Sequence, residues 1–91
     1  MENPVVKTMD EVAGREGVLA VVCADNDGFP VQVRGSVPSQ AAGVITQMCE
    51  LAKQLEQDVN TTPMIQLETD HMNVFIQKKD MATVAVYQKK E

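Results

Sequence analysis

The sequence predicts a single α+β domain over residues 1–91, a sandwich in the order α-β-β-α-β-β-β with a five-stranded antiparallel sheet. Three observations support this class. One long segment carries apolar residues at helical spacing, short segments rich in β-branched residues read as strands, and turn-forming residues separate most of them. At 91 residues, the chain fits one domain with a modest core, because so short a chain buries only about 60% of its unfolded surface.

The first element is a helix within residues 1–14. Asn3 can act as its N-cap, and Pro4 suits the first helical position, where the missing N–H has no partner to lose. Apolar residues then recur at helical spacing. Gly14 and Gly17 are expected to end the helix.

Two strands follow as a hairpin. Residues 17–24 (GVLAVVCA) form an unbroken apolar run, which is typical of an interior strand covered on both faces. Residues 29–35 (FPVQVRG) alternate, with Val31 and Val33 on one face. Because Pro30 cannot donate a hydrogen bond to a neighbouring strand, it places this second strand at an edge of the sheet.

The residues between these strands, Asp25 to Gly28, resemble a calcium loop at first sight. Placing Gly28 at the sixth position of an EF-hand loop puts Cys23 first and Arg34 twelfth, where oxygen ligands are required. The segment is therefore expected to be a turn, in which aspartate and asparagine tolerate tight geometry and Gly28 supplies a positive φ.

The longest helix is predicted to start at Pro38 or Ser39 and to extend toward Asp58. Its apolar arc spans about 180°, whereas a helix that only covers its own sheet needs about 100°. One side carries Ala41, Val44, Ile45, Met48, Leu51, Ala52 and Leu55, and Ala42 and Cys49 extend it. The surplus flank with Ala42 and Cys49 either takes a second surface or is covered by the N-terminal helix.

Three closely linked strands complete the chain. They are predicted at residues 64–69 (MIQLET), 74–79 (VFIQKK) and 81–89 (MATVAVYQK), after a break at residues 60–63 and with residues 70–73 (DHMN) as a turn. Connections this short indicate an antiparallel meander.

The composition excludes several classes of function. A net charge of −5 argues against a nucleic-acid binder and against docking on anionic lipid. The longest apolar run, residues 18–24, is too short to span a membrane, and no signal peptide or lipidation motif is recognisable, so direct membrane insertion is not expected.

No reactive centre is recognisable either. Cys23 and Cys49 have no CxxC spacing and are expected to be buried, reduced thiols. His71, the only histidine, lies in a predicted turn without the neighbouring ligands that zinc requires. We therefore expect no catalytic residues, no metal and no cofactor.

Several segments together resemble the roadblock/light-chain-7 (LC7) superfamily, and within it the family of the fifth subunit of the Ragulator complex. They are GVLAVVCADNDG, VRGSVPSQAAGVI, PMIQLETDHMNVFIQKKD and ATVAVYQ, and the resemblance extends from about residue 15 to residue 88. The resemblance implies a roadblock/longin-like (profilin-like) sandwich, with the sheet on one side and the long helix on the other.

Roadblock domains pair, with the long helices antiparallel and the third strands joining two sheets into one. The resemblance therefore implies a partner interface at Ala41, Ala42, Ile45, Met48, Cys49, Ala52 and Leu55 in the helix, and at Met64, Ile65, Gln66, Leu67 and Glu68 in the edge strand. It favours a partner over the N-terminal helix as the cover of the helix flank.

The implied function is that of a non-enzymatic scaffold subunit in a Ragulator-like lysosomal complex. It would pair with a second roadblock subunit, be held on the late endosome or lysosome by a lipidated adaptor subunit, and help recruit Rag GTPases, which link amino-acid availability to the TOR kinase. When isolated, the chain could form a homodimer. The alternatives are a dynein-type roadblock light chain acting as a homodimer, and a small-molecule sensor or enzyme of profilin-like shape with a closed pocket around Cys23, Cys49 or His71.

Overall fold

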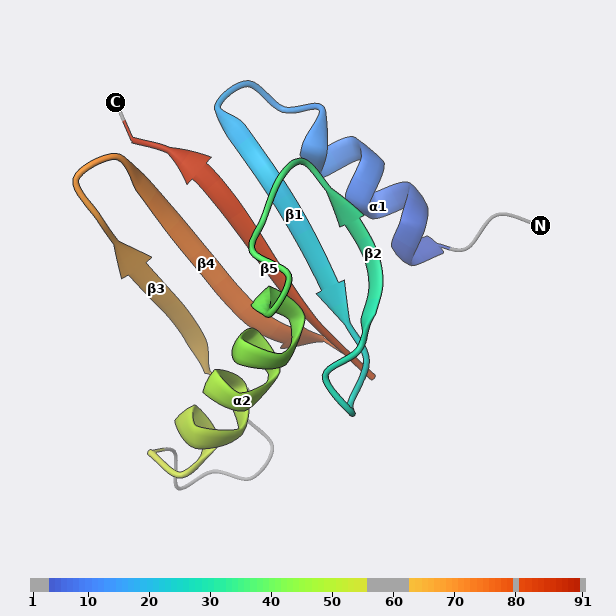
Figure 1. Ribbon diagram of the computed structural model, residues 1–91, viewed down its shortest axis with the longest axis vertical. Coiled ribbons are helices and arrows are strands. Elements are labelled where there is room, and N and C mark those ends of the chain that lie inside the picture. The colour runs from blue at the N-terminus through green and yellow to red at the C-terminus, as the bar shows by residue number, and fades with distance from the viewer. Residues whose placement is uncertain (1–3, 56–62, 80, 91) are drawn as a thin grey trace.

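The computed structural model describes residues 4–55, 63–79 and 81–90. The predicted order of elements is confirmed (Figure 1). The elements are α1 (Pro4–Ala13), β1 (Val18–Ala24), β2 (Pro30–Arg34), α2 (Ala41–Lys53), β3 (Met64–Glu68), β4 (Met72–Lys79) and β5 (Ala82–Lys89).

All five strands form one sheet in the order β2-β1-β5-β4-β3, and every neighbouring pair is antiparallel. The predicted hairpin and meander are both confirmed. β1 lies inside the sheet, and its last five residues are buried. β2 is an edge strand, as Pro30 indicated, and β3 is the opposite edge.

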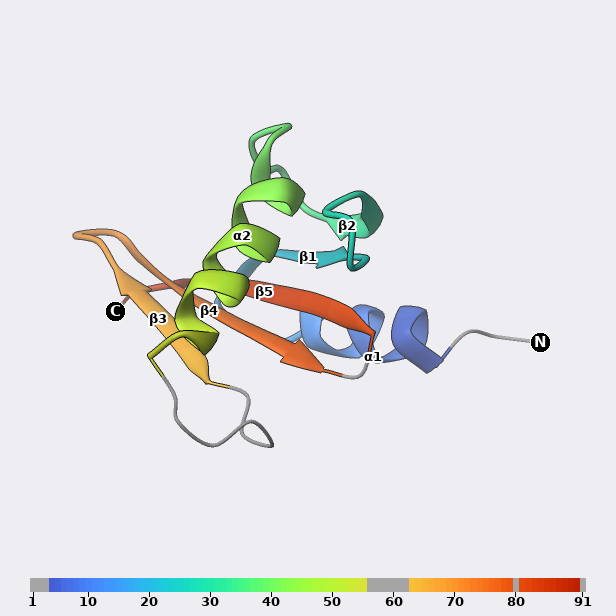
Figure 2. The same cartoon turned by 90° about the horizontal axis from the view of Figure 1, so that it is seen from below.

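The two helices cover opposite faces of the sheet (Figure 2). Alternate residues of β1 therefore pack into two different hydrophobic clusters, one on each face of the sheet. Val22 and Ala24 pack in the cluster under α2. Val21 and Cys23 pack with Met9 of α1. An ion pair of 2.7 Å between Asp10 Oδ1 and Arg34 Nε adds a link from α1 to β2. The chain is thus a three-layer sandwich, and the interpretation that the N-terminal helix covers the flank of α2 is wrong, since the sheet lies between them.

The β1–β2 turn is organised by one carboxylate. The backbone N–H groups of Asp27 and Phe29 both donate to Asp25 Oδ1 at 2.9 Å. Gly28 has φ +86°, a value that favours glycine, and its N–H donates to the Asp25 carbonyl at 3.1 Å. The predicted turn is confirmed, and Asp25 Oδ1 serves it by accepting both of these backbone hydrogen bonds.

The structure corrects two predicted boundaries. α2 begins at Ala41 rather than at Pro38 or Ser39, because the Ala41 N–H donates to the Pro38 carbonyl at 3.0 Å and closes a separate turn before the helix. β4 begins at Met72, within the predicted turn, because the N–H groups of His71 and Met72 donate to the Thr69 hydroxyl and tighten the reversal. The predicted N-cap Asn3 and the break at residues 60–62 lie outside the described residues.

Candidate partner-binding surface

The inner side of α2 is a stripe of small and aliphatic side chains that face this chain's own sheet. Ala41, Ala42, Ile45 and Cys49 are each at most 7% exposed, and they share a core with residues of β1, β4 and β5 that include Ile76. These four were predicted to contact a partner. The structure removes them from the candidate surface, because their side chains are already buried within the chain.

The outer flank of α2 carries the apolar residues that the sheet does not use. Val44 is 49% exposed, Leu51 63% and Leu55 88%. At 100° per residue these three side chains lie on one side of the helix, next to half-buried Met48 and about 100–140° from Glu50. The surplus of the apolar arc is therefore at Val44, Leu51 and Leu55, and not at Ala42 and Cys49 as the sequence suggested.

Polar side chains occupy the other flank of the same helix. The Thr46 hydroxyl donates to the Ala42 carbonyl at 2.8 Å. Glu50 Oε1 lies 3.5 Å from Lys53 Nζ and 3.8 Å from Lys78 Nζ of β4. The two flanks of α2 thus differ in chemistry, and only one offers an apolar contact surface.

The edge strand β3 lies beside the helix (Figures 1 and 2). Among the described residues it pairs only with β4, and they leave its other backbone edge open. Ile65 and Leu67 pair with Ile76 and Val74, two residues of the core under α2, and therefore point to the same face of the sheet as the helix. Leu67 is 40% exposed and Met64, on the opposite face, 61%.

Helix and strand together form one surface, called here the α2–β3 surface. It consists of Val44, Met48 and Leu51 of α2, Leu55 in the turn that follows the helix, Ile65 and Leu67 of β3, and the open backbone edge of that strand. An ion pair of 3.1 Å between Lys90 Nζ and Glu68 Oε1 fixes one end of the strand. Of the predicted interface residues, Met48, Ala52, Leu55 and Met64 to Glu68 remain partly or largely exposed.

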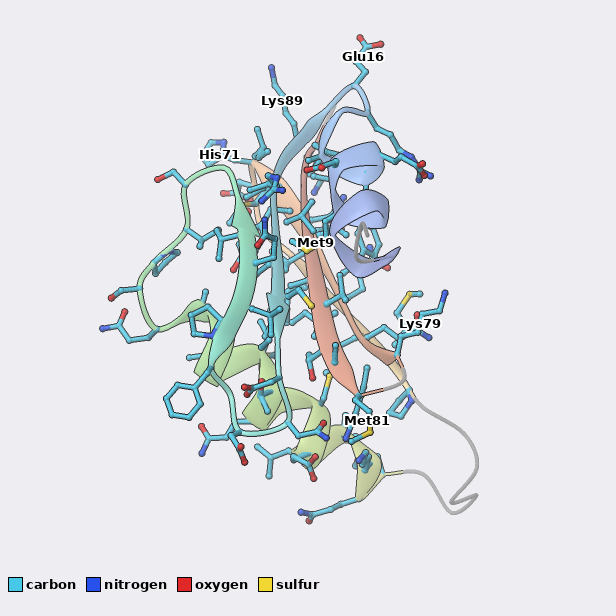
Figure 3. The ribbon with its side chains drawn as sticks, turned by 90° about the vertical axis from the view of Figure 1, so that its right-hand side faces the viewer. Met9, Glu16, His71, Lys79, Met81 and Lys89 are labelled. Carbon is cyan, nitrogen blue, oxygen red and sulfur yellow. The ribbon has the colours of Figure 1, made fainter. Side chains whose placement is uncertain are left out.

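Side chains suited to covalent chemistry do not converge in the described residues. Cys23 and Cys49 are buried on opposite faces of the sheet. Burial raises the pKa of both thiols; at Cys49 the positive charges of Lys53 and Lys78 oppose the rise without cancelling it. His71 is exposed in the β3–β4 turn at one end of the sheet (Figure 3). A closed pocket around Cys23, Cys49 or His71, which the sensor alternative requires, therefore has no support.

Within the described ranges, no three histidine, cysteine or acidic residues gather in a way that could hold a metal ion. None of the helices in these ranges has the length and apolar character that a membrane span requires.

Two important residues of the surface, Val44 and Leu51, were absent from the predicted interface. Their positions on the helical wheel were the available signal, since both lie at the margin of the apolar arc farthest from Ala42. The exposure of Phe29, Val31 and Val33 at 67%, 48% and 37% was not predicted either. The alternation of residues in β2 correctly placed Val31 and Val33 on one face of the strand. It did not show that α2 leaves this face uncovered.

Comparison with known proteins gives a consistent result. The family described as "Ragulator complex protein LAMTOR5" matches residues 1–88, which include α1. A Ragulator complex protein LAMTOR5 homolog from Ixodes scapularis is 46% identical over 87 residues, covering 96% of this chain and 94% of the relative. The Xenopus laevis LAMTOR5 protein is 32% identical over 87 residues, covering 96% of each chain.

Solved structures support the fold independently of sequence. A roadblock/LC7 domain from Streptomyces avermitilis superposes with a TM-score of 0.77 at 18% identity, covering 91% of this chain and 76% of that one. The gliding protein MglB from Thermus thermophilus superposes with a TM-score of 0.76 at 11% identity, covering 98% and 76%. The chain has the roadblock/LC7 fold and belongs to the family of the Ragulator complex protein LAMTOR5.

Proposed function

We propose that this protein is a non-enzymatic scaffold subunit that pairs with a second roadblock-domain subunit through the α2–β3 surface. One observation carries the proposal: an exposed apolar helix flank lies beside an open strand edge, on the same side of the molecule. An open edge promotes unwanted pairing unless a partner covers it.

The two parts of the surface suit one partner of similar shape. A second helix laid against Val44, Leu51 and Leu55 would remove apolar side chains from water, which contributes about 25 cal/mol for each Å² buried. A strand added to β3 would satisfy its open backbone groups and extend the sheet across both chains. A partner with the same fold supplies both elements at once.

Within a Ragulator assembly, the pair would serve as a platform on the late endosomal or lysosomal surface. A lipidated adaptor subunit would hold the platform at the membrane, and the assembled complex would recruit Rag GTPases, so that amino-acid availability controls TOR kinase activation. Family membership supports this role. The chain's contribution is the placement of its partners, with no bond made or broken at its own residues.

The proposal predicts that charge on the outer flank of α2 prevents pairing without unfolding the chain. Leu51→Asp and Leu55→Asp place a carboxylate where the partner helix would pack, at positions 63% and 88% exposed in the isolated chain. Each variant is expected to weaken binding to the cognate roadblock subunit at least tenfold, because an unpaired charge at an interface costs about 2 kcal/mol or more. Co-purification followed by light scattering measures the loss.

Met81→Asp is the matched control, since Met81 is 73% exposed and lies outside the α2–β3 surface. It should pair like the wild type. Normal pairing by both leucine variants would contradict the proposed interface. A wild-type chain that forms only homodimers and co-purifies with a dynein intermediate chain would instead support the dynein-type alternative.

A further inference from the structure

A groove of about 400 Å³ lies on the polar side of α2. It shares one residue, Val44, with the α2–β3 surface. The β1–β2 turn forms one wall with Asn26, Asp27 and Gly28. The helix forms the other wall with residues Gln40, Gly43, Val44, Thr46, Gln47 and Glu50. Two segments far apart in the sequence therefore enclose one concave, solvent-open site.

The glycine on the helix wall has no packing explanation. Glycine is among the least favourable residues in a helix interior. A Cβ added at Gly43 would lie 3.9 Å from the Gly28 carbonyl oxygen, an ordinary contact, and meets no other atom within 4 Å. Alanine would therefore fit the free chain and favour the helix, whereas glycine keeps the backbone of α2 open to a group that enters the groove.

The polar groups of the groove favour a cation. Asp27 and Glu50 contribute carboxylates, and Asn26, Gln40 and Gln47 contribute side-chain amides, whereas no lysine or arginine among the described residues lines the site. Glu50 is only loosely held by Lys53 and Lys78, at 3.5 and 3.8 Å, and its side chain remains 58% exposed. The positive potential of the α2 N-terminus opposes a cation at Gly43, which lies in the first turn, so the carboxylates of Asp27 and Glu50 must outweigh it.

We propose that this groove binds the guanidinium group of an arginine presented by a basic segment of a partner protein. A guanidinium is flat, so it can lie against the exposed backbone at Gly43, and its five N–H donors can bond to carboxylate and amide oxygens of the kinds that line the groove. The net charge of −5 favours the approach of a basic segment from a distance. The site shares only Val44 with the helix flank proposed for roadblock pairing and does not include the strand edge.

The test uses the full chain, uniformly labelled with ¹⁵N, and two probes of the same shape. Nα-acetyl-arginine amide carries the charge, and Nα-acetyl-citrulline amide replaces the guanidinium by an uncharged urea. The arginine probe is expected to shift backbone amides of the Asp27–Gly28 turn and of residues 43–50 saturably, with a dissociation constant of about 1–10 mM. The citrulline probe should bind at least about threefold more weakly.

Variants separate a built groove from general attraction to an acidic protein. Glu50→Gln should weaken binding of the arginine probe about threefold to tenfold, whereas Glu16→Gln, at an exposed acid on another part of the chain, should leave it unchanged. Gly43→Ala should raise the melting temperature yet weaken binding at least about threefold. Equal binding of the two probes, linear shifts without saturation, or an equal loss in Glu16→Gln would each overturn the proposal.

Discussion

The inner and outer sides of α2 are both apolar, yet they differ sharply in exposure. Ile45 and Cys49 on the inner side are each 3% exposed, whereas Leu51 on the outer flank is 63% exposed. The sheet beneath accounts only for the inner residues, which pack on β1, β4 and β5. The comparison teaches that apolar residues beyond those needed for folding mark a surface available for assembly, especially where an open strand edge adjoins them.

The largest expected effect is a difference in the free energy of unfolding between alanine substitutions on the inner and outer sides of α2. Ile45→Ala should lower the free energy of unfolding by about 2–5 kcal/mol, because it removes buried methyl groups and leaves a cavity. Leu51→Ala should change it by no more than about 0.5 kcal/mol, since the side chain is largely in water. Urea denaturation of the isolated monomer measures both. If Leu51→Ala lowered the free energy of unfolding as much as Ile45→Ala, Leu51 could not be an exposed residue outside the core.

The loop that leads into α2 offers a second test of what sets the helix against the sheet. Gly35 has φ +85°, and an added Cβ would collide with the Leu19 carbonyl oxygen and with Ala20 of β1. Gly35→Ala should therefore destabilise the fold by about 2–4 kcal/mol, through backbone strain and overpacking. Thermal and urea unfolding should agree on the loss.

Gly17 is the matched control for that substitution. It has the same φ of +85°, but an added Cβ meets nothing within 4 Å. Gly17→Ala should cost only the backbone strain, about 1–2 kcal/mol. Equal losses in the two alanine variants would show that close packing of the loop against β1 contributes nothing to the position of α2.

The smallest expected effect is a change in how stability depends on pH, caused by the buried thiol of Cys49 on the inner side of α2. Burial raises the folded-state pKa of Cys49 above its ordinary value of 9.0. The thiol therefore favours folding at pH values below 9.0, and the contribution is lost as the pH rises through the folded-state pKa, because the unfolded chain releases its proton first. Each such thiol adds a slope of at most about 1.4 kcal/mol per pH unit in that range. Cys49→Ala should show a shallower decline above pH 9, and an unchanged slope would contradict burial of the thiol.

Much of the fold followed from local signals in the sequence. Pro30 placed β2 at an edge, the continuous apolar run of β1 indicated an interior strand, and Asp25 with Gly28 indicated the turn. These predictions succeeded because each depends on the backbone chemistry of a few residues. The predicted start of α2 was wrong because the Pro38 carbonyl accepts a hydrogen bond in a separate turn before the helix. The residue types alone do not determine whether these residues form that turn or the first turn of the helix.

The candidate surface was harder to predict, because it depends on where elements lie relative to one another. Periodicity gave the width of the apolar arc of α2 but not its rotation, so Ala42 and Cys49 were assigned to the wrong flank. Nor could spacing along the chain show that α1 crosses to the other face of the sheet, since Met9 would suit either core. The strand Met64–Glu68 does lie at an edge of the sheet, but its place there was implied by the roadblock resemblance and not by spacing along the chain.

The most direct test of the pairing proposal is backbone hydrogen exchange of the chain alone and after mixing with its cognate roadblock subunit. Pairing through the α2–β3 surface predicts that exchange slows most in β3, residues 64–68, and in α2, whereas β2 changes little. β3 should respond because its open edge gains hydrogen-bond partners. Protection of β2 with unchanged exchange in β3 would contradict the account, since the partner would then occupy the opposite edge of the sheet.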